Sequence, residues 1–464
     1  MSSPSLADHP ADKLWQAPHA RGPVRATVEI PGSKSLSNRY LVLAALANAP
    51  SELTGVLDSR DTALMRDALE ALGATITPGD APGSYRITPL KPGTHFAEPL
   101  TIEVGLAGTV MRFIPPVAAL MQAEVHCVGD PEASARPMGP LLEGLRQAGV
   151  RITAETTPVA HLPFTVYGTG SVPGGTVCID ASGSSQFVSG LLLCAAHYER
   201  GLSIRHTGSR VPSPEHVGMT LKVLAEVGVE TASPEPGHWI VSPGPIRARN
   251  TAVEPDLSNA GVYLAAAVIT GGRVSIPHWP RETTQIGDRW QQILPRFGAD
   301  VQWAPNPEDD ASGTLTVTGQ TDSTGKPIIL GAGEIAGAAE LVPTIAALAL
   351  VADSETALTG IGHLRGHETD RLHAIVTEAT KLGARVHATD TALYFSPSEQ
   401  LRPATLDSWA DHRMATFGAL AGLHIPGVSV RDITTTSKTM PRFPLAWSEL
   451  FGLEATAERT MVQG

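Results

Sequence analysis

One pattern recurs six times along the chain: a helical segment ends at a glycine, and a strand of alternating apolar and polar residues follows. The copies span residues 67–77, 143–153, 222–232, 292–302, 378–388 and 447–457, and their glycines are Gly73, Gly149, Gly228, Gly298, Gly383 and Gly452. Each glycine stands where the end of a helix needs a left-handed residue. Pro295 weakens the helix of the fourth copy, and the sixth copy has no clear strand. One copy would be an ordinary α/β connection, but six predict two similar lobes of three units, with a boundary near residues 242–256.

Composition limits what such lobes can bind. The 464 residues are 42% apolar and 17% charged, which suits two cores of roughly 200 residues each. The net charge is −12 and aromatic residues make up 5%, whereas a nucleic-acid-binding face is basic and stacks bases on aromatic side chains. We therefore expect no nucleic-acid partner. Anionic small molecules remain suitable ligands, and in a chain with seven lysines a lysine within a Gly/Ser-rich motif stands out.

The sequence carries no sign of export or membrane insertion. The N-terminal segment MSSPSLADHPADKLW lacks the cationic and apolar regions of a signal peptide. The longest apolar run, residues 341–352, is too short to cross a bilayer. Cys127, Cys178 and Cys194 each lie in an apolar run, so we expect three buried free thiols in a reducing compartment. These features predict a cytoplasmic protein, with residues 1 to about 20 as a poorly ordered extension.

Three motifs place small polar residues before an amphipathic helix: PGSKSLSNR (31–39), GLAGTVMRF (105–113) and ASGSSQF (181–187). The first turn of a helix offers unpaired N–H groups and the positive end of the helix dipole, so each helix start suits an anion. In the first motif we expect Ser35 or Ser37 to cap the helix and Lys34 to face the anion. Its spacing is not that of a Walker A loop. Any one motif could be an ordinary helix cap, but together with Lys34 they indicate an anion site.

The second half of the chain adds charged residues. The motif RGHETDRLHAI (365–375) is expected to begin a helix at Glu368, with Arg371 one turn further on the same face. Arg413 and Lys438 are expected at helix starts as well. A Glu/Arg pair three residues apart is more often an exposed surface pair, so this motif is weak by itself. Zinc is disfavoured, because HETDR lacks the H-E-x-x-H spacing and no ligand set forms around it.

In chain order, seven motifs resemble those of the 5-enolpyruvylshikimate-3-phosphate synthase family: PGSKSLSNR, GLAGTVMRF, ARPMG, GSSQF, HETDRL, DHRMA and SKTMPRFP. The resemblance runs from about residue 20 to about residue 455. It implies an α/β fold of two similar lobes, each of three βαβαββ repeats in an inside-out α/β barrel arrangement, with the chain crossing between lobes twice. One lobe is expected at residues 33–251 and the other at residues 1–32 with 252–464.

The same resemblance implies a reaction. The enolpyruvyl group of phosphoenolpyruvate would pass to the 5-hydroxyl of shikimate 3-phosphate through a tetrahedral intermediate that loses phosphate, as a step of aromatic amino acid biosynthesis. No cofactor and no metal are expected, and the protein is expected to act as a monomer on these two small molecules.

Carried over motif by motif, the resemblance assigns site residues to each substrate. Shikimate 3-phosphate would be held by Ser35, Arg39, Ser184, Ser185, Ser213, Glu340 and His367. Phosphoenolpyruvate would be held by Gly108, Arg136, Arg371, Arg413 and Lys438. Lys34 and Gln186 would touch both. Glu340 would accept the hydroxyl proton and Glu368 would protonate the methylene carbon, while the division of acid and base work among these two and Lys34 stays open.

The chain departs from the family pattern at several of these positions. Many relatives have Asp in place of Glu340 and Lys in place of His367, so a shikimate-side contact could depend on pH here. Leu106 replaces a common Asn and Phe113 a common Pro. Because both flank the phosphoenolpyruvate loop, the family's affinity for glyphosate does not carry over to this chain.

Two alternatives stay open at this point. A sister family moves enolpyruvyl to a UDP-aminosugar, but it carries a reactive Cys before its Arg-Pro, and the corresponding segment GDPEASARP (129–137) has none. The other alternative is a catalytically inactive anion-binding protein on the same scaffold. Glu340, Glu368 and Lys34 speak for an enzyme, because a mere binder of anions has no use for two carboxylates. Phosphate release on mixing with both substrates would distinguish the three.

Overall fold

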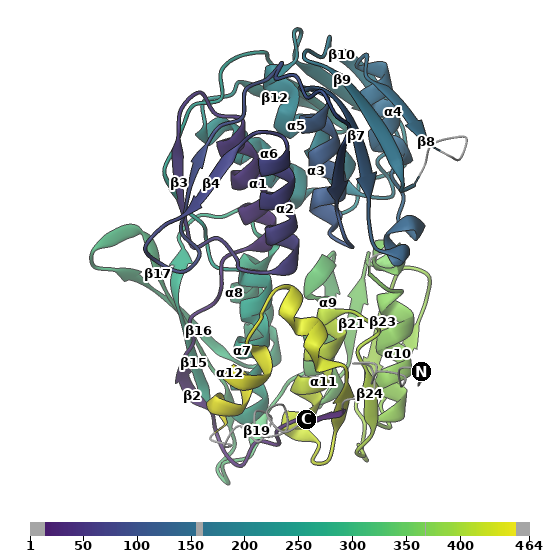
Figure 1. Cartoon of the computed structure of the whole chain (residues 1–464). Helices are drawn as coiled ribbons and strands as arrows, with labels where there is room; N and C mark the ends of the chain where they lie inside the picture. Colours follow the sequence, from purple (N-terminus) through teal and green to yellow (C-terminus); the bar gives the residue numbers. More distant parts are fainter. Residues whose placement is uncertain (1–13, 155–160, 367, 452–464) are drawn as a thin grey trace, which may run out of the picture. The chain divides into compact units, whose positions relative to one another are not determined.

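The computed structural model describes residues 14–154, 161–366 and 368–451. It divides into two compact units, unit 1 with residues 1–30 and 255–464 and unit 2 with residues 31–254. The chain therefore begins in unit 1, forms the whole of unit 2 and returns to unit 1 (Figure 1). The chain passes from one unit to the other at residues 30/31 and 254/255. The boundaries predicted from the sequence are 32/33 and 251/252.

Unit 2 contains three four-stranded sheets. The first has the strand order β14 (Thr251–Ala252), β3 (Ser51–Thr54), β5 (Tyr85–Thr88), β4 (Thr75–Pro78). The second has the order β6 (Leu100–Glu103), β7 (Gln122–Val128), β9 (Phe164–Thr169), β8 (Arg151–Ala154). The third has the order β10 (Gly175–Ile179), β11 (Leu202–His206), β13 (His238–Val241), β12 (Thr231–Glu235). In each sheet the first two strands are parallel and the remaining pairs antiparallel. A parallel pair needs a crossover, which is α3 (Gly108–Ala118) for β6–β7 and α5 (Ser185–Cys194) for β10–β11. In the first sheet the parallel strand β14 comes from the far end of the unit instead.

Unit 1 repeats this plan. Its sheets are β16 (Asp300–Asn306), β17 (Asp309–Thr318), β15 (Arg273–Pro280), β2 (Arg25–Thr27); β20 (Gly333–Ala336), β21 (Thr356–Thr359), β23 (Leu393–Ser396), β22 (Arg385–Ala388); and the three-stranded β1 (Leu14–Gln16), β25 (Ser429–Arg431), β24 (Thr405–Asp407). A short hairpin, β18 (Gln320–Thr321) and β19 (Pro327–Ile328), is added. The pairs β2–β15, β20–β21 and β24–β25 are parallel. The described residues thus contain six repeats, as the sequence predicts.

Distant parts of the chain complete three of these sheets. β2 supplies the parallel strand beside β15, and β14 supplies the one beside β3, although each lies some two hundred residues from its partner along the chain. β1 lies antiparallel beside β25 in the sixth sheet, with Trp15 opposite Val430. Residues 14–20 are therefore part of unit 1, and the expectation of a disordered extension to residue 20 was wrong for them. The apolar Trp15 and Ala17 give this segment a core side to pack.

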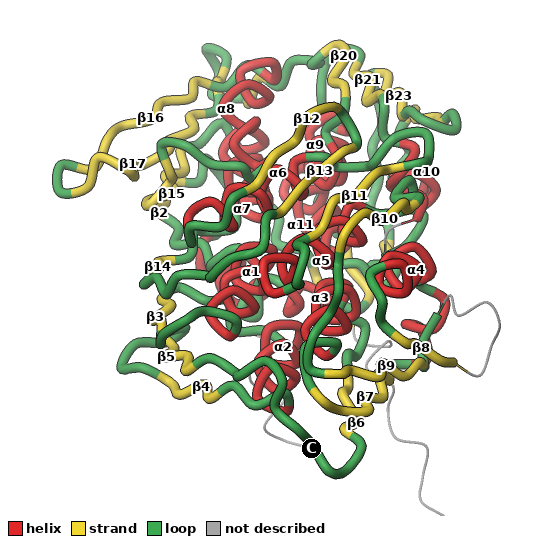
Figure 2. The backbone as a smooth tube through the Cα atoms, turned by 90° about the horizontal axis from the view of Figure 1, so that it is seen from above, coloured by secondary structure: helices red, strands yellow, loops and turns green. Residues whose placement is uncertain are grey.

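The helices fall into two classes, and their sequences explain the difference. Six helices are almost wholly buried: α1 (Lys34–Ala45), α3 (Gly108–Ala118), α5 (Ser185–Cys194), α7 (Leu257–Thr270), α9 (Val342–Leu350) and α11 (His412–His424). Most of them are apolar on nearly every side, whereas α1 begins with the polar run KSLSNR and is apolar in its second half. α2 (Arg60–Ala71), α4 (Gly139–Gln147), α6 (Glu215–Glu226) and α10 (Arg371–Lys381) are amphipathic and bury one face. In unit 2 the strands lie around the helices (Figure 2). Sheets outside and helices inside match the predicted inside-out arrangement.

Short helical segments complete the chain. They are η2 (Pro131–Ala135), η3 (Ala195–His197), η4 (Ile286–Arg289), α8 (Trp290–Ile293), η5 (Leu294–Phe297), η6 (Ala339–Leu341), η7 (Gly362–Gly366), η8 (Ile433–Lys438) and α12 (Phe443–Leu450). The longest helix of the described residues, α7, has 14 residues, and none of them is long and apolar enough to cross a membrane.

The repeat glycines behave as the sequence predicts. Gly73, Gly149, Gly228, Gly298 and Gly383 all have φ between 79° and 102° and end their helices, whereas Gly452 lies outside the described residues. In the fourth copy the α-helix stops at Ile293, and the turn that contains Pro295 is a 3₁₀ helix. Among the cysteines, Cys127 and Cys194 are buried, but Cys178 is exposed, because it points to the outer face of β10. The prediction of three buried thiols was wrong for that residue.

Candidate active site

In unit 2, the N-terminal turns of the three inner helices lie together. Asn38 Nδ2 of α1 donates a hydrogen bond of 2.6 Å to Thr109 Oγ1 of α3. A methyl group at Gly108 of α3 would lie 3.0 Å from Gln186 Oε1 of α5. Three helix starts with their unpaired N–H groups therefore converge, which favours negative charge between them.

Lys34 is the first residue of α1, and a buried carboxylate holds its side chain. Its Nζ lies 3.1 Å from Asp61 Oδ2, and the two side chains are 17% and 8% exposed. The helix is capped by Ser33, which accepts a hydrogen bond from the Leu36 N–H. The prediction that Ser35 or Ser37 is the cap was wrong, since Ser37 Oγ instead accepts a bond from the Leu57 N–H. Ser35 lies in the first turn beside Lys34, half-buried.

Gly108, Arg136 and Gln186 form one cluster. A Cβ at Gly108 would lie 2.8 Å from Arg136 Nη2, closer than real Cβ atoms come to other heavy atoms. Arg136 Nη1 also donates to the Leu106 carbonyl at 2.8 Å, so the guanidinium lies over the start of α3. The preceding residue, Ala107, has no polar side chain to cap that start. The cluster thus presents a guanidinium, a carboxamide and an uncapped helix N-terminus.

The remaining unit 2 residues lie at the starts of α5 and α6. Ser184 caps α5 and accepts a bond of 3.2 Å from the Gln186 N–H, and Ser185 is its first residue. Ser213, just before α6, has φ of +45°, a strained conformation for a residue with a side chain. Such strain is frequent at ligand-binding turns.

Arg39 is more deeply placed than its predicted role suggests. Its side chain is 1% exposed, and burial lowers its pKa to about 9. The guanidinium donates to Thr220 Oγ1, Ser189 Oγ and the Ser35 and His216 carbonyls, and it lies 5.3 Å from the ring centre of Phe113. Of its five N–H donors, one is left over for a ligand.

In unit 1, Glu340 lies at the start of the α9 segment. Ser258 Oγ of α7 donates to Glu340 Oε1 at 3.4 Å. The residue before the glutamate, Ala339, has φ of +42°. A left-handed alanine costs about 1–3 kcal/mol and persists only where its surroundings hold it. The Glu340 carboxylate is thus presented by a strained turn and contacted by a neighbouring helix.

Glu368 lies within a charged group of its own. Lys438 Nζ is 2.7 Å from Glu368 Oε1, and His412 Nδ1 is 3.2 Å from Glu368 Oε2. Burial lowers the pKa of His412, and Glu368 opposes that shift. The predicted helix start at Glu368 was wrong: α10 begins at Arg371, because Asp370 caps it by accepting a bond from the His373 N–H. Lys438 ends the 3₁₀ helix η8 instead of beginning a helix.

Arg371 forms the most buried ion pair of the group. Its Nε lies 2.7 Å from Asp411 Oδ2, with the side chains 3% and 0% exposed. Burial acts against both charged forms, but the mutual attraction outweighs it, so the pKa of Arg371 is raised and that of Asp411 is lowered. Asp411 also caps α11 through the Arg413 N–H at 2.8 Å, which fixes Arg413 in the first turn. His367 lies outside the described residues.

A metal ion is poorly suited to this group. Glu368, Asp411 and His412 bring their ligand atoms within 4.8 Å of one another, the sole set of its kind within residues 14–154, 161–366 and 368–451. Lys438 and Arg371 already neutralise the two carboxylates. A divalent ion would have to displace both cations, one of which is deeply buried.

Sequence reasoning missed Asp411, His412 and Ser258. The first two stand inside the quoted motif DHRMA, and an aspartate directly before an apolar helix is a cap signal that would have identified Asp411. Nothing local marks Ser258, whose contact with Glu340 joins residues 82 positions apart.

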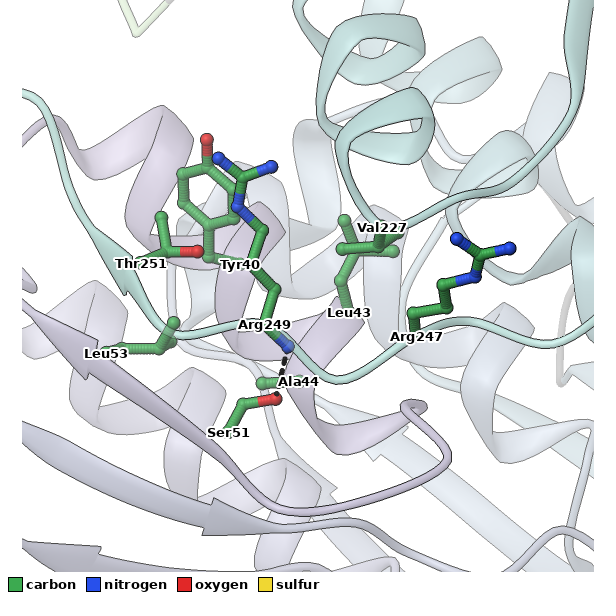
Figure 3. Close-up of a pocket in the computed structure, with 9 residues that line it drawn as sticks. All are labelled: Tyr40, Leu43, Ala44, Ser51, Leu53, Val227, Arg247, Arg249 and Thr251. Atoms are coloured by element: carbon green, nitrogen blue, oxygen red, sulfur yellow. Dashed lines mark hydrogen bonds between the residues drawn. The ribbon is translucent and has the colours of Figure 1, made fainter.

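One further hollow in unit 2 holds none of the predicted residues. Its volume is only about 10 Å³, and its lining is Tyr40, Leu43, Ala44, Ser51, Leu53, Val227, Arg247, Arg249 and Thr251 (Figure 3). The Arg249 N–H donates to Ser51 Oγ at 3.2 Å, and Tyr40 Oη donates to Glu226. A space of this size holds about one water molecule, so we assign it no part in the chemistry.

Comparison with known proteins gives consistent results. Residues 18–447 match the family model of EPSP synthase (3-phosphoshikimate 1-carboxyvinyltransferase). A 3-phosphoshikimate 1-carboxyvinyltransferase of Kocuria rhizophila is 52% identical over 452 residues, which cover 96% of this chain and 98% of that protein. Among solved structures, an EPSP synthase of Acinetobacter baumannii matches with a TM-score of 0.76 at 22% identity, over 94% of this chain and 97% of that one. The enolpyruvyl transferase NikO of Streptomyces tendae matches with a TM-score of 0.68 at 18% identity and the same coverage. At these identities, the two structures bear on the fold alone.

Proposed function

The chain belongs to the EPSP synthase (3-phosphoshikimate 1-carboxyvinyltransferase) family, and we propose that the side chains described above carry out the reaction of that family. The enolpyruvyl group of phosphoenolpyruvate passes to the 5-hydroxyl of shikimate 3-phosphate, and phosphate is released. The observation that best supports these residues is the convergence of three helix N-termini with Gly108, Arg136 and Gln186 in unit 2. Both substrates carry a phosphate and a carboxylate, which such an arrangement binds well.

The unit 2 residues divide between the substrates. Ser35, Ser184, Ser185 and Ser213 bind shikimate 3-phosphate through hydroxyl groups at helix starts, and Arg39 contributes its one remaining N–H. Gly108 and Arg136 bind phosphoenolpyruvate, and Lys34 and Gln186 contact both substrates. Because Asp61 already holds Lys34 by an ion pair, the ammonium is oriented before either substrate arrives.

The unit 1 residues supply the proton transfers and further cations. Glu340 accepts the proton of the attacking hydroxyl, and Arg371, Arg413 and Lys438 bind phosphoenolpyruvate. Glu368 protonates the methylene carbon. Lys438 Nζ lies 2.7 Å from Glu368 Oε1, so the ion pair holds the carboxyl group in position in the free protein. An incoming anion competes with Glu368 for the Lys438 ammonium.

The transfer to a UDP-aminosugar is the second candidate. The segment before Arg136 forms the 3₁₀ helix η2 with the sequence PEASA, so no thiol is available there for that family's chemistry. Phosphate release with shikimate 3-phosphate, and none with a UDP-aminosugar, is the expected result.

Lys34→Met tests the site directly. Removing a cation that contacts both substrates should lower kcat by on the order of 10³-fold. Because the change also takes one partner from the buried Asp61 carboxylate, the melting temperature should fall somewhat, and kcat is compared at a temperature at which both proteins are folded. Lys91→Met, at an exposed lysine of the same unit, is the matched control. Near-normal phosphate release by Lys34→Met would reduce the first motif to a plain helix start.

A further inference from the structure

We propose that Arg289 is a positioning residue for the reaction: it fixes the backbone in front of Glu340 and thereby holds that carboxylate in place. The inference rests on the proposed function, in which Glu340 accepts the proton of the attacking hydroxyl. Arg289 lies 51 residues before Glu340 and is the last residue of η4, directly ahead of α8 (Figure 1).

The guanidinium of Arg289 binds two neighbouring carbonyl groups at the end of β20. Nη1 donates to the Gly337 carbonyl at 2.7 Å, and Nη2 donates to the Ala336 carbonyl at 3.0 Å. Two donors in one rigid plane fix both the position and the direction of a backbone segment, which a single flexible ammonium does not. The last turn of the chain before Glu340 is thus clamped from η4.

The backbone held by Arg289 is strained, and the two hydrogen bonds from Arg289 stabilise it in that conformation. Gly337, which carries one of the two carbonyls, has φ of +58°, and Ala339, directly before Glu340, has φ of +42°. An alanine in this region relaxes to a right-handed or extended conformation unless both of its flanks are held. On the C-terminal side the flank is the buried helix α9. On the N-terminal side it is the pair of bonds to Arg289.

The same segment also anchors the helix that touches the carboxylate. Gln285 Oε1 accepts a bond from the Leu257 N–H at 3.1 Å, and Trp290 Nε1 donates to the Leu257 carbonyl at 3.0 Å. A Cβ at Gly287 would lie 2.3 Å from the Leu257 carbonyl carbon, so the backbones are in direct contact. The next residue is Ser258, which donates to Glu340. Residues 285–290 therefore hold both the backbone before Glu340 and the hydroxyl that binds its side chain.

Because Arg289 contacts backbone carbonyls and acts through Glu340, its loss should affect turnover more than binding. A displacement of about 1 Å in a reacting group costs on the order of 10²-fold in rate. For Arg289→Ala we expect kcat to fall by about that factor, with the KM for phosphoenolpyruvate within about twofold of the wild type and any larger rise in KM confined to shikimate 3-phosphate, which Glu340 contacts. Arg289→Lys keeps the charge but not the planar pair of donors, and its kcat should fall by about tenfold.

The control is another arginine of unit 1 that binds a backbone carbonyl. Arg385 donates from Nε and Nη2 to the Pro397 carbonyl on the surface, away from Glu340 in the sheet order. Arg385→Ala should leave kcat unchanged. Melting temperatures of all variants show that the fold is retained, and Arg289→Lys provides the kinetic answer if Arg289→Ala does not fold.

A double-mutant cycle with Glu340→Gln separates positioning from general stabilisation. If Arg289 acts through the carboxylate, Arg289→Ala should lower kcat by less than about twofold in the Glu340→Gln background, where the proton acceptor is already absent. A further loss of about 10²-fold in that background would overturn the inference. So would wild-type kcat in folded Arg289→Ala or Arg289→Lys while Glu340→Gln is inactive. Wild-type turnover by Glu340→Gln would instead contradict the proposed role of Glu340 itself.

Discussion

At the scale of single residues, position 108 is defined by what surrounds it. Gly108 is not in the left-handed region, so its backbone tolerates alanine, and the constraint is purely one of space. The two side chains that a methyl group would meet, Arg136 (Nη2 at 2.8 Å) and Gln186 (Oε1 at 3.0 Å), are flexible at the ends that it would touch. They can move aside, and both belong to the proposed phosphoenolpyruvate site.

Gly108→Ala should therefore fold normally and bind phosphoenolpyruvate less well. Displacing two ligand-binding groups by a few tenths of an ångström should cost about 1.4 kcal/mol, or roughly tenfold in KM for phosphoenolpyruvate. The KM for shikimate 3-phosphate should change less. Gly218→Ala is the control, because a methyl group at this helical position of unit 2 meets nothing within 4 Å and should be neutral or stabilising. Equal changes in both KM values would show that Gly108 does not line the phosphoenolpyruvate site.

Some features of single residues could be predicted from the local sequence, and others could not. The left-handed conformation of the repeat glycines could be predicted, because a helix end of this kind favours glycine in any surroundings. The burial of Arg39 could not be foreseen, since its partners Thr220 and Ser189 come from helices far along the chain. The contact of Phe113 with Arg39 explains why a bulky apolar residue is tolerated there: the ring is fully buried and packs against the guanidinium.

At the scale of elements, the start of α11 combines several tasks in one turn. Asp411 caps the helix and pairs with Arg371. Trp409 and Ala410 before it have φ of +55° and +52°, and Trp409 Nε1 donates to the buried Glu378 at 2.7 Å. Sequence periodicity identified the helix, but the turn depends on contacts with α10 that periodicity does not report. The start of α10 was predicted three residues too early, at Glu368 and not at Arg371, because the local cap Asp370 was not recognised.

Asp411→Asn breaks this buried ion pair and should lower the free energy of unfolding by an amount that depends on pH. The pKa of Asp411 is lowered from its ordinary 3.8 in the folded protein, because the attraction of Arg371 outweighs burial. Its stabilising contribution is thus complete above about pH 4 and is lost as the pH falls through the lower pKa of the folded state. At pH 7 the free energy of unfolding of the variant, measured by urea unfolding, should be about 3–5 kcal/mol lower than that of the wild type. The difference from the wild type should shrink below pH 4. A difference that stays constant down to pH 2 would show that Asp411 acts only as a neutral cap.

At the scale of the whole molecule, each unit is closed by chain segments remote in sequence. Unit 1 cannot form from residues 255–464 alone, because β1 and β2 complete two of its sheets. Six repeats and two lobes could be predicted because the repeat is local. The pairing of β2 with β15 and of β14 with β3 is not visible in any local pattern. The family resemblance implied that the chain crosses between the lobes twice, but it did not predict the place of β14.

Deleting residues 1–17 should therefore destabilise unit 1 and spare unit 2. The deletion removes β1, exposes the edge of β25, and takes away Trp15, whose ring lies 6.5 Å from that of Phe443, and Ala17, whose Cβ fills the space above Gly422. Loss of these contacts should cost about 2 kcal/mol, which corresponds to a fall of about 4–8 °C in the melting temperature of a unit of this size. Hydrogen exchange should quicken in β24, β25 and α11 and stay unchanged in the sheets of unit 2. A deletion of residues 1–12 removes none of these contacts and is the control. Equal loss of protection in both units would mean that they unfold as one cooperative body, and that the sheets closed by residues 1–30 contribute to the stability of the entire chain.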